Sequence, residues 1–211
     1  MAETASSISD LRLHIFDRIV NMKIVSANFI TSAFDKGGWP NTGMPEIAFA
    51  GRSNVGKSSL MNLLLNRQKL VKTSSSPGKT RSINFFEINE KFILTDLPGY
   101  GFAKGDKSEI AKWKPMIEEY LSKRDTLKAL IHIVDVRREP NDLEIMLAEW
   151  VRHKNIPHIL VANKADKLSK NKCAQSSAAI ERILGAKPIL SSTLSKLGRN
   201  EIWGAITPLL I

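Results

Sequence analysis

Residues 47–58 read IAFAGRSNVGKS, and this stretch decides the fold. Ile47–Ala50 is a continuous apolar run typical of a buried strand, and a helical pattern begins at Lys57. Between them, Gly51–Ser58 matches G-x-x-x-x-G-K-[ST], in which glycines let successive backbone N–H groups face a phosphate and the helix N-terminus adds its positive end. A glycine turn followed by a surface lysine is the less specific alternative. The strand and helix context favours a loop that binds nucleotide phosphates.

Short apolar runs alternate with amphipathic stretches of helix length along the rest of the chain. We expect strands at Ile47–Ala50, Ile83–Ile88, Phe92–Thr95, Ala129–Val134, His158–Ala162 and Pro188–Leu190. We expect helices at Lys57–Asn66, Lys107–Lys123, Asp142–His153, Lys172–Leu184 and Arg199–Leu209. The alternation predicts one three-layer α/β domain, with a mixed, mostly parallel six-stranded sheet between helices on both faces. Because only Asn89–Lys91 separates the second and third strands, we expect a hairpin there and one antiparallel strand at an edge.

The composition is that of an ordinary globular protein with an excess of positive charge. The chain has 211 residues, 43% of them hydrophobic, and a formal net charge of 31 − 21 = +10, which favours a polyanionic partner. Cys173 is the single cysteine, so a disulfide framework and a multi-cysteine metal site are excluded. No apolar run approaches the ~18 residues of a membrane helix, and Met1–Ser7 shows no basic leader. We therefore expect a cytoplasmic protein that does not enter the membrane.

Two further motifs follow predicted strands and indicate which nucleotide binds. Asp96–Gly99 (DLPG) can hold a Mg²⁺-bound water through Asp96 and contact a γ-phosphate through the Gly99 N–H. In Asn163–Asp166 (NKAD), the Asp166 carboxylate can accept both N1–H and N2–H of guanine, while Lys164 packs on the base and Asn163 ties the loops together. Adenine presents a lone pair at N1, a mismatch that costs about 1–3 kcal/mol. In this order after a phosphate loop, the motifs favour GTP over ATP.

Two loops with weaker signals complete the predicted site. Thr80 ends a basic, Ser/Thr-rich stretch, and its hydroxyl can join the Mg²⁺ shell while a γ-phosphate is present, which is the order–disorder switch of such proteins. Ser191–Thr193 follows the last short strand and can contact the guanine edge. In the phosphate loop, Lys57 would neutralise β/γ oxygens and Ser58 would place its hydroxyl on Mg²⁺.

The candidate site residues come from all of these loops. The candidate catalytic residues are Lys57, Thr80 and Gly99. The candidate Mg²⁺ ligands are Ser58, Thr80 and, through water, Asp96. The candidate residues for binding GTP or GDP are Gly51, Arg52, Ser53, Asn54, Val55, Gly56, Lys57, Ser58, Ser59, Gly78, Lys79, Thr80, Arg81, Ser82, Asp96, Leu97, Pro98, Gly99, Asn163, Lys164, Ala165, Asp166, Ser191, Ser192 and Thr193.

The motifs resemble those of the EngB (YihA/YsxC) family of bacterial ribosome-assembly GTPases. The resemblance runs from about Leu11 to the C-terminus and is carried by Gly51–Ser59, Pro77–Thr80, Asp96–Ala103 and Val134–Arg137. It implies a P-loop GTPase domain at residues 45–211, an N-terminal extension at 1–44 that packs on this core, and Mg²⁺ in the site. It also implies a nucleotide switch in the assembly of the large ribosomal subunit and a requirement for normal cell division and septation.

Two residues bear on hydrolysis. Tyr100 follows the DLPG motif, where many GTPases carry the glutamine that orients the attacking water, so we expect slow intrinsic hydrolysis. Asn54 is a candidate for coordinating K⁺, which would add positive charge at the reaction centre. The alternative is a loop residue that hydrogen-bonds its own backbone. The histidines stand apart from the motifs in sequence, and we interpret them as structural or surface residues: His14, His132, His153 and His158.

The positive charge gathers in three stretches, two of which border nucleotide loops. The stretches contain Arg67, Lys69, Lys72, Lys79 and Arg81, then Arg152, Lys154, Lys164, Lys167, Lys170 and Lys172, and then Arg182, Lys187, Lys196 and Arg199. We expect a monomer that contacts rRNA of the large subunit in a salt-dependent way and without DNA specificity, a solvated basic face being the alternative. Two other functions stay open at this point, a P-loop ATPase and an RNA-binding module whose nucleotide site is structural.

Overall fold

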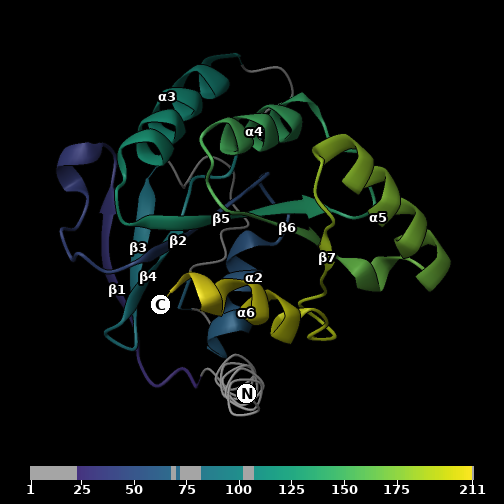
Figure 1. Cartoon of the computed structure of the whole chain (residues 1–211), viewed down its shortest axis with the longest axis horizontal. Coiled ribbons are helices and arrows are strands. Elements are labelled where there is room, and N and C mark those ends of the chain that lie inside the picture. The colour runs from purple at the N-terminus through teal and green to yellow at the C-terminus, as the bar shows by residue number, and fades with distance from the viewer. Residues whose placement is uncertain (1–22, 68–69, 72–81, 102–106, 211) are drawn as a thin grey trace, which may run out of the picture.

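The computed structural model describes residues 23–67, 70–71, 82–101 and 107–210 (Figure 1). Within them, one seven-stranded sheet has the order β1-β3-β4-β2-β5-β6-β7. The strands are β1 (Ala27–Ala33), β2 (Glu46–Gly51), β3 (Ile83–Ile88), β4 (Phe92–Asp96), β5 (Leu127–Asp135), β6 (His158–Asn163) and β7 (Ile189–Leu190). The helices are α2 (Lys57–Leu65), α3 (Lys107–Lys123), α4 (Asp142–His153), α5 (Lys170–Leu184) and α6 (Arg199–Ile206).

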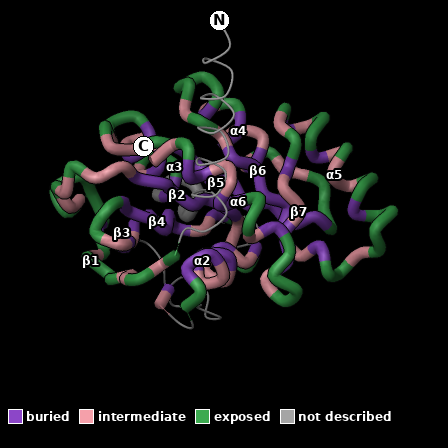
Figure 2. Tube along the Cα trace, turned by 60° about the horizontal axis from the view of Figure 1, so that its bottom comes forward, coloured by how far each residue is buried: buried purple, intermediate pink, exposed green. Residues whose placement is uncertain are grey.

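Helices cover both faces of the sheet, which confirms the predicted three-layer α/β fold. The helices α2 and α6 lie on one face, and α3, α4 and α5 lie on the other (Figure 1). The central strand β2 is buried along its whole length because alternate residues pack on opposite layers. Phe49 belongs to the core with α2 and α6, whereas Ala48 belongs to the core with α3 and α4. A strand buried on both faces reads as a continuous apolar run, and Figure 2 shows the strands as the buried centre.

The strand directions correct one part of the prediction. The hairpin across Asn89–Lys91 is confirmed, with Ile88 paired to Phe92 in antiparallel register. The prediction of six strands with the antiparallel one at an edge is wrong, because β1 pairs with β3 and takes the edge position. The sequence of β1 does not alternate cleanly, because most of its residues are at least partly exposed and its register shifts between Phe29 and Thr31.

The element boundaries lie within a few residues of the prediction. The helix α5 begins at Lys170, two residues earlier than expected, because the Ser169 hydroxyl accepts a hydrogen bond from the Lys172 N–H and caps it. The helix α6 ends at Ile206 and continues as a 3-10 turn over Thr207–Leu209. Among the described residues, no helix is long and apolar enough to cross a membrane.

Candidate nucleotide site

The loop after β2 forms a backbone cradle at the carboxyl edge of the sheet. Asn54 has φ of 63° and Gly56 has φ of 99°, so the chain turns twice through the left-handed region. Gly51 must be a glycine for a steric reason, since a Cβ there would lie 2.7 Å from the Ile133 carbonyl oxygen of β5. No side chain caps α2 at Gly56. The first N–H groups of this helix are therefore available to an anion, as a phosphate loop requires.

Lys57 and Asp96 form an ion pair between the first turn of α2 and the end of β4. Both are buried, with 8% and 3% of their surfaces exposed. Ser58 follows Lys57 in the same turn. A hydroxyl and a carboxylate supply the hard oxygen ligands that Mg²⁺ prefers, and Mg²⁺ usually adds waters and phosphate oxygens to such a pair. The residues present thus fit a magnesium nucleotide.

The DLPG turn lies directly against the phosphate loop. The Leu97 N–H donates to the Phe49 carbonyl at 3.0 Å, and the Ser53 N–H donates to the Tyr100 carbonyl at 2.9 Å. Gly99 comes so close that a Cβ would lie 3.1 Å from the Ser53 Oγ and 3.3 Å from its backbone nitrogen. The structure therefore brings the DLPG turn against the phosphate loop, with Asp96 paired to Lys57 and Gly99 next to Ser53.

Tyr100 points into the core. Its phenol lies 2.9 Å from His132 Nε2, and its ring centre lies 4.9 Å from that of Trp113. Burial, and then the charge of Glu144, raise the pKa of Tyr100 well above its usual value. The ring of His132 stacks on His158, and burial lowers the pKa of His132 to about 3. The sequence placed the histidines apart from the motifs, but in the structure His132 is completely buried and touches the residue that follows the DLPG motif.

The NKAD loop is clamped onto the phosphate loop. The Asn163 Nδ2 donates to the Val55 carbonyl at 2.9 Å, and the Lys164 Nζ donates to the Asn54 carbonyl at 2.7 Å. A Cβ on Gly56 would collide with the Asn163 amide. The predicted tie between the two loops through Asn163 is therefore present.

Asp166 is held by Ser192 on one oxygen, and its other oxygen lies 3.3 Å from the Nζ of Lys167, whose side chain is half-exposed. The Ser192 hydroxyl donates to Asp166 Oδ1 at 2.7 Å, and this hydrogen bond lowers the pKa of the carboxyl. The Ala165 N–H donates to the Ser191 carbonyl at 2.9 Å, which fixes the two loops together. Ser192 was expected at the guanine edge, and the structure places it as the group that orients Asp166. An ionised, oriented carboxylate at this place can accept two N–H groups of a guanine base.

Comparison with known proteins agrees with this geometry. Residues 46–164 match the family model described as a 50S ribosome-binding GTPase. The probable GTP-binding protein EngB of Geobacter metallireducens is 48% identical over 192 residues, covering 90% of this chain and 94% of its own. That of Bacillus subtilis is 44% identical over 193 residues, covering 90% and 99%. The chain belongs to the EngB family of GTP-binding proteins. Its fold also matches a crystal structure of a probable GTP-binding protein EngB, with a TM-score of 0.66, 22% identity, and coverage of 78% of this chain and 98% of that one.

Membership of the EngB family identifies the chain as a GTPase and removes the P-loop ATPase alternative. The resemblance stated from the sequence is thus confirmed. Four of the predicted nucleotide-binding residues, Gly78, Lys79, Thr80 and Arg81, lie outside the residues that the structure describes. Ser82 is described, and its hydroxyl donates to Asn84 Oδ1 at 3.3 Å rather than facing the phosphate loop.

One residue of this EngB-family site, Asp135 at the end of β5, had no role assigned from the sequence. Its carboxylate accepts from Arg137 Nε at 2.8 Å and from Lys164 Nζ at 3.1 Å. Burial raises the pKa of Asp135, but the hydrogen bonds from Arg137 and Lys164 outweigh it and hold that pKa well below its usual range. Asp135 thus holds the Lys164 ammonium in place beside Asn54. The Val134–Arg137 stretch was noted only as part of the family resemblance.

Two buried polar atoms at this EngB-family site have no partner within the chain. Among the described residues, the buried side-chain atoms without a hydrogen-bond partner are Trp39 Nε1, Asn163 Oδ1 and Ser191 Oγ. The last two belong to the loops predicted to meet the base. Since buried polar groups are usually paired, these atoms are places where a ligand or an ordered water would be accommodated.

Proposed function

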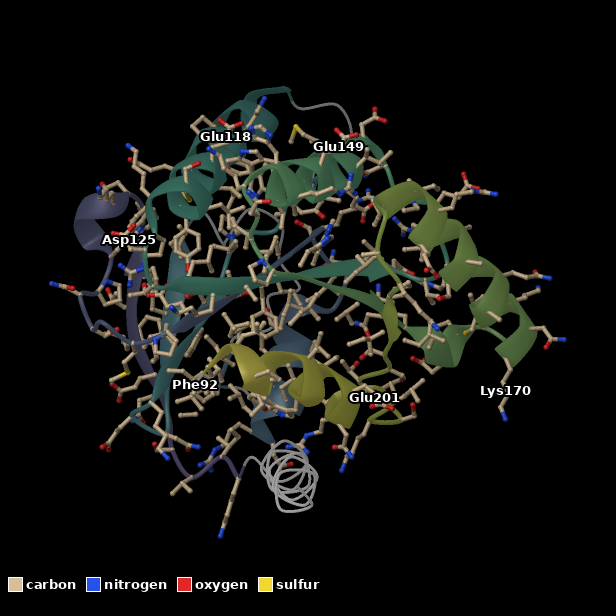
Figure 3. The ribbon with its side chains drawn as sticks, viewed as in Figure 1. Phe92, Glu118, Asp125, Glu149, Lys170 and Glu201 are labelled. Carbon is tan, nitrogen blue, oxygen red and sulfur yellow. The ribbon has the colours of Figure 1, made fainter. Side chains whose placement is uncertain are left out.

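We propose that this GTPase is a nucleotide-gated factor in the assembly of the large ribosomal subunit, and that it binds rRNA through a basic surface beside its NKAD loop. The observation that carries the proposal is the position of Lys167, Lys170 and Lys172. All three are exposed and lie within six residues after Asp166 in the chain. Figure 3 shows Lys170 directed away from the body of the protein at the start of α5. The family described as ribosome-binding supports the same partner.

Two of the expected basic residues donate to backbone carbonyls of the protein. Arg152 Nη2 donates to the Leu184 carbonyl at 2.9 Å, and Arg199 Nε donates to the Leu63 carbonyl at 3.1 Å. We therefore assign the RNA-facing role to the exposed residues of the second and third basic stretches that make no such bond, which are Lys154, Lys167, Lys170, Lys172, Arg182, Lys187 and Lys196. Contact through such side chains neutralises phosphates, so it should weaken steeply with salt.

In the proposed mechanism, each loop has a separate task. Ser58, Thr80 and, through water, Asp96 would hold Mg²⁺, which would screen charge on the phosphates. Lys57 neutralises the phosphate oxygens, and the Gly99 N–H donates to the γ-phosphate. Asp166 and Ser191–Thr193 hold the guanine edge. The buried phenol of Tyr100 does not reach this space, which supports slow intrinsic hydrolysis.

We also propose that K⁺ stimulates hydrolysis through Asn54, whose side chain is exposed at the mouth of the phosphate loop. The test compares turnover in KCl with turnover in NaCl at equal ionic strength, with large ribosomal subunits present. Faster turnover in KCl, lost in Asn54→Ala, is expected. Equal turnover in both salts would contradict this role.

The remaining assignments follow from the family. We propose that the protein acts as a cytoplasmic monomer, with residues 45–211 as the GTPase domain and residues 1–44 as an extension packed on it. In this view, impaired septation on loss of the protein follows from a shortage of ribosomes.

The proposed function is tested by co-sedimentation with purified large ribosomal subunits across a salt series. We expect pelleting with a non-hydrolysable GTP analogue, little with GDP, and none for Lys57→Ala. The double variant Lys170→Glu/Lys172→Glu should release at lower salt. Its control is Lys128→Glu. Lys128 is exposed at the start of β5, where the amino ends of the parallel strands lie, opposite the end that carries the nucleotide loops. Pelleting that ignores the nucleotide would favour an RNA-binding module with a structural nucleotide site.

A further inference from the structure

The peptide that carries the Gly99 N–H is held from behind by a tryptophan of α3. The Trp113 indole N–H donates to the Pro98 carbonyl oxygen at 2.9 Å, and both groups are buried. A trans peptide is planar, so its N–H points opposite to its C=O. No cis peptide bond occurs in the described chain. The direction of the Pro98 carbonyl therefore determines the direction of the Gly99 N–H, which faces away from Trp113.

Gly99 itself lies against the phosphate loop. A Cβ on Gly99 would meet the Ser53 Oγ at 3.1 Å. Trp113 comes from the other layer, where it packs in the core with α3 and α4. The indole thus holds the Pro98 carbonyl from the core, while the next residue contacts the phosphate loop.

Tyr100 braces the indole. The two rings lie 4.9 Å apart at an angle of 59°, and the Tyr100 phenol is within 2.9 Å of His132 Nε2. His132 is itself fixed, since it is completely buried and its Nδ1 lies 3.3 Å from His158 Nε2. The chain of contacts therefore runs from β6 through β5 to the turn.

We propose that Trp113 and His132 are positioning residues for recognition of the γ-phosphate. Trp113 sets the peptide plane from which Gly99 donates, and His132 holds Tyr100 so that Trp113 cannot swing. The proposal rests on the γ-phosphate contact of Gly99 that belongs to the proposed function. Since the affected contact is made to the γ-phosphate, loss of either residue weakens binding of GTP and not of GDP.

The test measures the affinity of the full-length protein for GDP and for a non-hydrolysable GTP analogue by titration calorimetry with Mg²⁺. Trp113→Phe removes the donor, and Tyr100→Phe removes the phenol while keeping the ring. Each should lower the ratio of GTP-analogue affinity to GDP affinity about three- to tenfold, the range expected for one hydrogen bond. For His132, the Leu variant should lower the ratio, and the Gln variant should restore part of it because an amide can replace the imidazole nitrogen as partner.

Two buried aromatic residues away from the turn serve as matched controls. Trp203 is buried, and its indole donates to the Leu64 carbonyl at 3.2 Å. Tyr120 is buried, and its phenol donates to Glu46 at 2.7 Å. Trp203→Phe and Tyr120→Phe should lower the melting temperature but leave the affinity ratio at the wild-type value. If they lower the ratio as much as Trp113→Phe and Tyr100→Phe do, the effect is general destabilisation and the proposal is wrong.

Gly99→Ala separates this proposal from the proposed function, because it keeps the N–H but places a Cβ 3.1 Å from the Ser53 Oγ and so displaces the N–H from its position. If Gly99→Ala lowers the ratio and Trp113→Phe does not, Gly99 senses the γ-phosphate without help from Trp113, and the positioning role is overturned. If Gly99→Ala leaves the ratio unchanged while Lys57→Ala abolishes binding, the γ-phosphate role of Gly99 is wrong, and the positioning role falls with it.

Discussion

Two carboxylates, one at the amino ends of the parallel strands (the amino edge) and one at their carboxyl ends (the carboxyl edge), have different roles. Glu46, at the amino end of β2, is completely buried, and its oxygens accept hydrogen bonds from Tyr120, Arg124 and Thr126 at 2.7, 2.7 and 2.9 Å. Asp166 follows the carboxyl end of β6; its Oδ1 accepts from the Ser192 hydroxyl, and its Oδ2 lies 3.3 Å from the Nζ of Lys167, whose side chain is half-exposed. The comparison teaches that a carboxylate whose partners are all buried within the chain is structural. One that shares an oxygen only with a half-exposed lysine can exchange that partner for a ligand.

The largest effect is expected at the amino edge, from Arg124→Ala. This change leaves the Glu46 carboxylate buried without its cation, and loss of one partner of a buried ion pair costs about 3–5 kcal/mol. Urea unfolding without nucleotide measures the loss. The matched control is Lys123→Ala, one residue earlier, whose exposed pair with Glu119 should contribute less than about 1 kcal/mol. If the two variants lose the same free energy of unfolding, the structural role assigned to Glu46 is wrong.

At the carboxyl edge, Asp166→Ala should show the reverse pattern. Removing the acceptor of two guanine N–H groups should weaken GDP binding by about 1.5–3 kcal/mol, which is the usual contribution of hydrogen bonds to a charged group. The free energy of unfolding without nucleotide should stay close to that of the wild type, because the Asp166 side chain supports little besides its loop. Calorimetric titration and urea unfolding on the same samples give both quantities. A large loss of stability with unchanged GDP affinity would mean that Asp166 has a structural role and does not bind the base.

Between the two edges, the histidines of the core make stability depend on pH. Burial lowers the pKa of His132 to about 3 and that of His158 to about 4, both below the ordinary value. Protonation therefore favours the unfolded chain, so stability is full above about pH 6.5 and is lost as the pH falls toward 4. For His132 the loss at pH 5 is about 2 kcal/mol.

The measurement is the free energy of unfolding of His132→Gln at pH 7 and pH 5. We expect the variant to lose less stability between these two pH values than the wild type does. The control is His153→Gln, because His153 is exposed and lies outside the buried histidine pair. A pH dependence that is the same in wild type and His132→Gln would show that His132 is not buried in its neutral form.

The smallest effect is expected from Ser192→Ala. Loss of one hydrogen bond to Asp166 should weaken GDP binding by about 1 kcal/mol near neutral pH. The Ser192 hydroxyl lowers the pKa of Asp166, and guanine needs the ionised carboxylate. Binding in the wild type should therefore persist to a lower pH than in the variant as the solution is acidified. If GDP affinity falls over the same acidic pH range in both proteins, Ser192 does not hold Asp166 in its charged form.

The sequence predicted the parts of the site that depend on local backbone. The phosphate loop, the DLPG turn and the NKAD loop each follow a strand and carry their chemistry within a few residues, so their residue types and spacing were enough. Their meeting at one edge followed from the parallel strands between them. The tie between Asn163 and the phosphate loop was also foreseen, because parallel strands bring these loops side by side.

The rest depends on contacts between residues far apart in the chain. The pairs Trp113–Pro98, Tyr100–His132 and Arg124–Glu46 are separated by 15, 32 and 78 positions, and no local pattern signals them. The edge strand β1 was missed because it buries few of its residues, so its sequence lacks the alternation of a half-buried strand. From the sequence, Arg152 and Arg199 were counted among the basic residues expected to meet RNA. In the structure both donate to backbone carbonyls at helix ends.

The most direct test of the account compares GDP with ADP on the wild-type protein, by calorimetric titration with Mg²⁺. Asp166 is proposed to accept the N1–H and N2–H groups of guanine, which adenine does not offer. We therefore expect binding of GDP and an affinity for ADP that is lower by a factor of about 5–150, the cost of a repelled and unpaired carboxylate. Equal affinities for the two nucleotides would contradict it.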